Sequence, residues 1–290
     1  AHSIGIVADA KLHPLSGMNT FDRALTWLGE HQPALARELE TRRDKLLDFA
    51  FLRGYSHDAR QFFSGDRWAL TGDAGAFLDP FYSPGTDFIA IANTYITALI
   101  GLDRAGQRIA PFARLYEQLF RAFYGNTLSL FRGQYPLFGN ADVMPLKVTW
   151  DYTYYWGILC QIVMQDRLTD IALFADVQAE LARADRLNRR MQVLLRRWAA
   201  VNVAENPPAM LDQIDLPWFV ELNRGLTDRI DREQVIARLR RHVALMEELA
   251  ATIADRARRS CPDLDLDGLE RTASETESET GGLGLFDAAA

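Results

Sequence analysis

Residues 72–85 read GDAGAFLDPFYSPG and lie between an apolar segment that favours a strand and a longer one that favours a helix. The WALTG segment carries Asp73 near its end, where an open sheet usually presents groups that bind ligands. Ser83 suits a helix N-cap, and Pro84 suits the first helical position because no N–H group is needed there. Gly85 has no side chain, so a planar ligand could lie against the backbone at the positive end of the helix. The stretch therefore predicts a strand, loop and helix that together bind a ligand.

The stretch and the helix after it, GDAGAFLDPFYSPGTDFIAIANTYITALI, resemble a segment of a known enzyme family. They look like the second flavin-binding segment of the FAD-dependent monooxygenases, and most of all that of the flavin-dependent halogenases, where the pattern is GDAA-x-F-x-DP-x-x-SSG. The resemblance is tight over residues 64–104, looser over 1–63 and faint over the rest of the chain. It implies that the chain binds FAD.

The resemblance also assigns roles to individual residues. Asp73 would hold the ribityl or pyrophosphate end of FAD, Pro80 would lie near the isoalloxazine, and the backbone of Gly85 and Thr86 would face the pyrimidine edge. The positions assigned to cofactor binding are Gly72, Asp73, Ala74, Pro80, Ser83, Pro84, Gly85, Thr86 and Asp87. The sequence assigns no catalytic residue.

Three positions depart from the family pattern. Pro84 has no N–H group at a position where halogenases use backbone N–H groups to hold the halide. Tyr82 stands where the tryptophan-halogenase type has a glutamate, and Asp87 stands where relatives have Asn or His. A carboxylate beside a reduced, anionic flavin would be unfavourable, so we expect Asp87 to point away and to complement the first turn of the helix. Flavin binding is thus better supported than halogenation.

The GxGxxG turn that binds the ADP pyrophosphate in this family has no counterpart here, because Gly5 and Gly17 are isolated. The family's N-terminal lysine, which passes on the oxidised halide, has no counterpart either. We therefore expect the chain to correspond to the C-terminal half of a flavoprotein and to be inactive without the missing N-terminal half. That half could be truncated, could have been trimmed, or could be a companion chain.

The composition narrows the class of protein. With 290 residues, 48% hydrophobic content and a net charge of −7, the chain predicts a globular protein without the basic face of a nucleic-acid binder. Cys160 and Cys261 are far apart and indicate reduced thiols in a cytoplasmic protein. The five histidines show no metal spacing, so no metal site is expected. The apolar run 88–100 is too short for a membrane span, and no signal peptide is evident.

The hydrophobic pattern predicts an α/β front part, an incomplete flavin-binding and substrate sheet, followed by a mainly helical part. Strands are predicted over 2–9, 46–56 and 67–74, with a turn at 64–66, and helices over 19–40. The predicted domains are 1–105 for the front part, 106–269 for the helical part and 270–290 for a disordered acidic tail.

Five to seven helices are expected between 109 and 260. Residues 146–165 are apolar on nearly every side and should be central, whereas 232–259 are amphipathic and should close a bundle rather than form a coiled-coil dimer. Aromatic residues cluster at 148–157. They favour core packing, and the alternative is a substrate-lining role for Trp150, Tyr154 and Trp156.

These observations predict the C-terminal part of an FAD-dependent oxidoreductase of the monooxygenase and halogenase type. Its substrate would be a small aromatic or otherwise apolar molecule, and a flavin reductase would be a partner. Two alternatives stay open: a flavin-dependent reductase of prenyl or lipid chains, and an inactive fragment that serves as a helical binding module. A long apolar tunnel would favour the reductase, and an upstream GxGxxG would argue against the inactive fragment.

Overall fold

The computed structural model describes residues 2–203 and 211–264, and its chain divides into two compact units. The units are Ala1–Ser56 and His57–Ala290, and each is described by itself. The predicted acidic tail at 270–290 lies outside the described residues. The predicted domain bounds stay a prediction.

The first unit contains two short α-helices, α1 (Phe21–His31) and α2 (Pro33–Glu40), which pack against each other. Thr20 caps α1, because its side chain accepts a hydrogen bond from the Arg23 backbone N–H at 3.4 Å. The predicted helices over 19–40 are confirmed. Short 3₁₀ turns flank them at Leu15–Gly17 and Arg43–Lys45.

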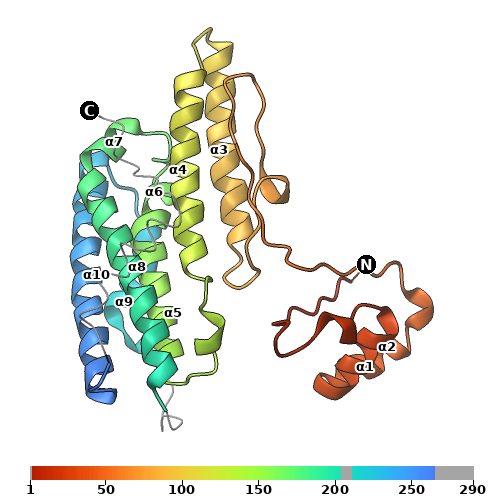
Figure 1. The fold of residues 1–290 in the computed structure, drawn as a ribbon. Coiled ribbons are helices and arrows are strands. Elements are labelled where there is room, and N and C mark those ends of the chain that lie inside the picture. Colours follow the sequence, from red (N-terminus) through yellow and green to blue (C-terminus); the bar gives the residue numbers. More distant parts are fainter. Residues whose placement is uncertain (1, 204–210, 265–290) are drawn as a thin grey trace. The chain divides into compact units, whose positions relative to one another are not determined.

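The second unit is a helical bundle whose long helices run side by side (Figure 1). In it α3 packs on α4, α4 and α5 pack on α8, and α8 packs on α10. The α-helices of this unit are α3 (Pro84–Arg104), α4 (Ala110–Ser129), α5 (Val143–Tyr154), α6 (Cys160–Met164), α7 (Ile171–Asp176), α8 (Gln178–Val201), α9 (Pro217–Arg224) and α10 (Arg232–Ser260). The prediction of a helical part after residue 85 is confirmed.

Aromatic side chains hold α3 and α4 together. Phe88 of α3 lies against Phe123 of α4, and Tyr95 stacks on Tyr116 with 4.5 Å between ring centroids. All but Phe123 are almost fully buried, so this contact belongs to the main hydrophobic core. Among the described residues α3 alone is long and apolar enough to span a membrane, a test that core helices also pass.

The prediction of an α/β front part with a sheet is wrong. The described residues contain no strand, and residues 57–77 show only isolated bridges, between His57 and Phe77 and between Phe63 and Ala69. The predicted turn is present, since the Ser64 N–H bonds the Trp68 carbonyl across it at 3.0 Å. Strand-like sequence makes a strand only where a second backbone pairs with it. Residues 2–9 and 46–54 show no such pairing among the described residues, and their apolar side chains stay largely exposed.

The segment 146–165 is central, as predicted, but it is not one regular helix. A π-helical turn, Tyr155–Leu159, interrupts it between α5 and α6. The Gly157 carbonyl in this turn is 2.7 Å from Nδ1 of His242 on α10, so the histidine satisfies this backbone oxygen. Burial lowers the pKa of His242, which favours a neutral ring that donates this hydrogen bond.

Candidate functional site

The GDA stretch forms a single 3₁₀ turn, Gly72–Ala74, ahead of the apolar loop. Gly72 has φ +60°, a left-handed conformation that glycine adopts without strain. The carbonyl of Asp73 is 2.9 Å from Nε2 of His57, which fixes the backbone. The carboxylate of Asp73 is exposed and has no partner among the described residues. It is therefore free to accept hydrogen bonds from a ligand.

A left-handed turn then leads into α3. Tyr82 and Ser83 have φ values of +65° and +53°, which non-glycine residues rarely adopt. Ser83 occupies the N-cap position, as predicted, but its side chain does not cap the helix. As a result, the backbone N–H groups of Gly85 and Thr86 have no acceptor among the described residues. A Cβ atom built on Gly85 would meet nothing within 4 Å, so open space adjoins these donors.

Three tyrosine–carboxylate hydrogen bonds attach the loop to the helices behind it. The bonded pairs are Tyr135 with Asp79, Tyr82 with Asp151 at 2.9 Å, and Tyr155 with Asp87 at 2.9 Å. In each pair the phenol donates and the carboxylate accepts. The loop is thus anchored at its start, at its left-handed turn and at the first turn of α3.

Asp87 is the carboxylate that conflicts with the family pattern. It is half-buried, and its Oδ1 accepts the hydrogen bond from Tyr155, the first residue of the π-helical turn. Burial raises the pKa of Asp87, and the bond from Tyr155 only partly opposes this shift. The neutral carboxyl is therefore favoured to a higher pH than in an exposed aspartate, which lessens any repulsion of an anion near α3.

Behind the loop lies a buried polar cluster that the sequence analysis missed, formed by Lys147, Asp151, Asn188 and Gln192. Its side chains are at most 2% exposed. Lys147 Nζ donates to Asp151 Oδ2 at 2.7 Å and to Gln192 Oε1 at 2.8 Å, and Gln192 Nε2 donates to Asp151 Oδ1 at 2.7 Å. Burial lowers the pKa of Lys147 and raises that of Asp151. The signal was present in the sequence as a Lys–Asp pair four residues apart within an apolar helix.

The candidate substrate residues occupy different environments. Trp150 is 0% exposed and donates from Nε1 to Asn188 at 2.9 Å, so it lies in the core. Trp156 is partly exposed and lies 4.8 Å from the ring centroids of both Tyr152 and Phe219. Tyr154 is partly buried and packs against the main core. The structure does not bring these three side chains together in one contact.

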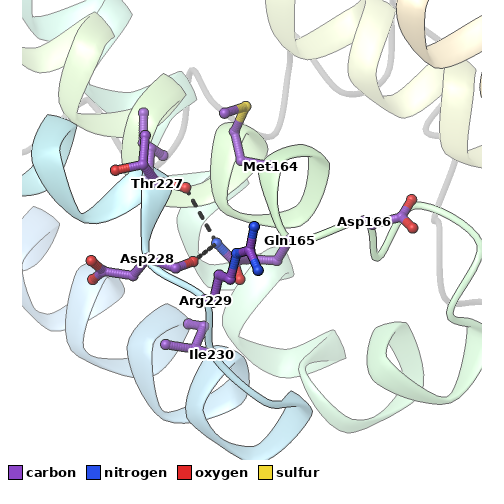
Figure 2. A pocket seen from close by; sticks show the side chains of 8 residues that line it. Met164, Gln165, Asp166, Thr227, Asp228, Arg229 and Ile230 are labelled. Atoms are coloured by element: carbon purple, nitrogen blue, oxygen red, sulfur yellow. Dashed lines mark hydrogen bonds between the residues drawn. The ribbon is translucent and has the colours of Figure 1, made fainter.

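A surface pocket of about 650 Å³ lies elsewhere, between the end of α6 and the segment before α10 (Figure 2). Gln165 crosses its floor and donates to the Leu226 and Asp228 carbonyls at 3.2 and 2.8 Å. None of the candidate flavin residues lines it. Since its best-placed polar side chain is occupied by these structural bonds, the pocket offers no evidence of a ligand site.

No known family model matches this chain, and neither does any solved structure. Among curated proteins, the flavin-dependent halogenase chlA of Dictyostelium discoideum is 27% identical over 161 residues. The alignment covers 54% of this chain and 26% of that protein, so the chain spans about a quarter of the length of its relative. Over about half its length, the chain is therefore similar to a flavin-dependent halogenase, as the motif at 72–85 indicates.

Proposed function

We propose that residues 72–87 form part of a flavin site in a flavin-dependent oxidoreductase of the halogenase type, with FAD as the cofactor. The observation that carries the proposal is the open start of α3. The N–H groups of Gly85 and Thr86 have no acceptor among the described residues, and open space surrounds the Cβ position of Gly85 beside a left-handed turn. The carboxylate of Asp73, also without a partner there, lies on the same loop. The similarity of about half the chain to a flavin-dependent halogenase supports a flavin as the ligand.

The residues present fit a flavin. Gly85 and Thr86 supply N–H donors and a partial positive charge for the electron-rich edge of the ring, and Asp73 accepts hydrogen bonds from ribityl or ribose hydroxyls. Pro80 supplies an apolar surface at the exposed side of the loop. The reduced cofactor would supply the reaction with O₂, and this chain's residues would bind it, orient it and exclude water.

The aromatic surroundings of the loop support the proposed substrate class. Tyr82 lies near Phe81, Phe131 and Tyr152, with ring centroids between 4.3 and 6.1 Å apart. Trp156 continues this group through Tyr152. A small aromatic or otherwise apolar molecule would suit such surroundings, and a flavin reductase would supply the reduced cofactor.

The test is a titration of the chain with FAD, followed by flavin fluorescence and by visible absorption after desalting. Gly85→Leu should fold normally because nothing lies within 4 Å of its Cβ position, yet the leucine would fill the space assigned to the flavin. We expect binding to weaken at least tenfold, which corresponds to about 1.4 kcal/mol.

Gly101→Leu is the matched control, since Gly101 lies on the same helix, is exposed and also has no atom within 4 Å of its Cβ position. The control should bind FAD as the unchanged chain does. Equal binding by both leucine variants would contradict the proposed site, and a chain that never binds FAD would contradict its assignment to this chain. Retention of a prenyl or lipid chain together with FAD would favour the alternative of a flavin-dependent reductase.

A further inference from the structure

One hydrogen bond joins the buried carboxylate of Asp151 to the loop. Asp151 accepts hydrogen bonds from Lys147, Gln192 and Tyr82, and only Tyr82 belongs to the loop rather than to α5 or α8. Oδ2 receives both Lys147 and Tyr82, and Oδ1 receives Gln192. The hydrogen bond from the Tyr82 hydroxyl therefore links this carboxylate directly to the loop at residues 72–85.

Joining two helices through a buried charged cluster costs desolvation free energy. Desolvation of a buried Lys–Asp pair offsets much of its attraction, and apolar residues of similar size often stabilise a core as well. Helices α5 and α8 already share apolar contacts in the main core, for example Trp150, Leu195 and Val143. The specific consequence of the cluster is a fixed acceptor for the Tyr82 hydroxyl.

The left-handed turn at Tyr82 needs such a fixed hydrogen-bond acceptor to hold its backbone conformation. Tyr82 and Ser83 are consecutive non-glycine residues with positive φ, and each is disfavoured unless its surroundings hold it. The ring of Tyr82 packs between Phe81 and Phe131, while its hydroxyl reaches Asp151. The ring and the hydroxyl together select this backbone conformation.

We propose that Tyr82 is a positioning residue, whose hydrogen bond to the buried Lys147–Asp151 pair holds the left-handed turn that presents Gly85 and Thr86 to the flavin. The inference rests on the proposed function for its ligand, but the turn itself can be examined without any ligand. Tyr82 acts through the backbone that follows it and does not bind the cofactor itself.

The experiment compares Tyr82→Phe with Tyr95→Phe. The first substitution keeps the ring and removes the hydroxyl that bonds Asp151. Tyr95 is also buried but stacks on Tyr116, and its hydroxyl has no hydrogen bond among the described residues. Hydrogen exchange of the Ser83 amide, whose N–H bonds the Pro80 carbonyl at 2.9 Å, reports on the turn without FAD when followed by NMR, and an FAD titration reports on the site.

We expect exchange of the Ser83 amide to rise roughly ten- to a hundredfold in Tyr82→Phe, as for loss of a hydrogen bond to a charged group. FAD binding should weaken by a similar factor, while exchange in α8 and α10 should stay unchanged. Tyr95→Phe should leave the turn and the flavin affinity as they were.

A double-mutant cycle separates positioning from general loosening. In the background Lys147→Met/Asp151→Leu the acceptor is gone, so Tyr82→Phe should cause no further rise in exchange of the Ser83 amide. Additive effects of the two changes, or wild-type exchange in Tyr82→Phe, would overturn the inference. A turn that loosens as expected supports it even if the unchanged chain binds no FAD, and that second result would count against the proposed function alone.

Discussion

Two effects act in opposite directions on the charge of Asp87. It stands in the first turn of α3, where a negative charge interacts favourably with the helix, but it is also half-buried against Tyr155. Burial is the larger influence and raises its pKa above the ordinary value of 3.8. The side chain thus keeps its hydrogen bond in either protonation state, since the acceptor oxygen is present in both.

This predicts a pH-dependent effect of Asp87→Asn. Between the unfolded and the raised folded pKa the folded state binds more protons, so the stability of the unchanged chain falls as pH rises through that window. Asparagine does not titrate and still accepts from Tyr155. The variant and the unchanged chain should therefore melt alike near pH 4, and the variant should melt higher near pH 7.

Thermal melts across this pH range check the prediction. Asp73→Asn is the control for net charge, because this exposed carboxylate has no partner among the described residues. A constant difference between Asp87→Asn and the unchanged chain at every pH would refute it.

At the scale of elements, side chains of α4 bind the backbone of residues 59–63, which precede the loop at 72–85. Glu117 Oε2 accepts the backbone N–H groups of Phe62 and Phe63 at 2.7 and 3.0 Å. Its Oε1 accepts from Arg121 at 2.6 Å, and Arg121 in turn donates to the Ala59 carbonyl at 2.9 Å. This irregular segment therefore depends on a helix, where a strand would depend on a neighbouring strand.

Glu117→Ala should accordingly destabilise the second unit by about 2–4 kcal/mol, since it leaves two buried backbone donors and Arg121 without their acceptor. Denaturant unfolding followed by tryptophan fluorescence measures this. Arg114→Ala, at an exposed position of the same helix without a partner among the described residues, should change stability by less than about 0.5 kcal/mol. Equal losses of stability in the two variants would show that the hydrogen bonds of Glu117 do not stabilise this segment.

For the whole molecule, the Lys147–Asp151 pair is where the bundle is most sensitive to single changes. Lys147→Met leaves a buried carboxylate without its cation and should cost about 3–5 kcal/mol. Lys147→Met/Asp151→Leu replaces both charges by apolar groups and should recover most of that loss. Equilibrium unfolding of the two variants decides the matter, and a double variant less stable than the single one would contradict this account.

Much of the helical structure could be predicted because helix signals are local. Thr20 and Pro84 mark helix starts, and the spacing of apolar residues over 232–259 matches α10. The loop at residues 72–85 could also be singled out, because its glycines and prolines follow one another in a recognisable order, and its role in flavin binding stays a prediction. The similarity of about half the chain to a flavin-dependent halogenase agrees with the family that this order resembles.

The sequence by itself determined where the helices lie and which loop resembles a flavin segment, because helical hydrogen bonds and capping join residues at most four positions apart. Only the tertiary structure decided that the expected strands form no sheet among the described residues, that Tyr82 reaches a carboxylate 69 residues away, and that Lys147 is buried beside it. Backbone pairing and burial depend on residues that are distant in the sequence and meet only in the fold. For that reason the chain's local pattern identified the loop but not the cluster that anchors it.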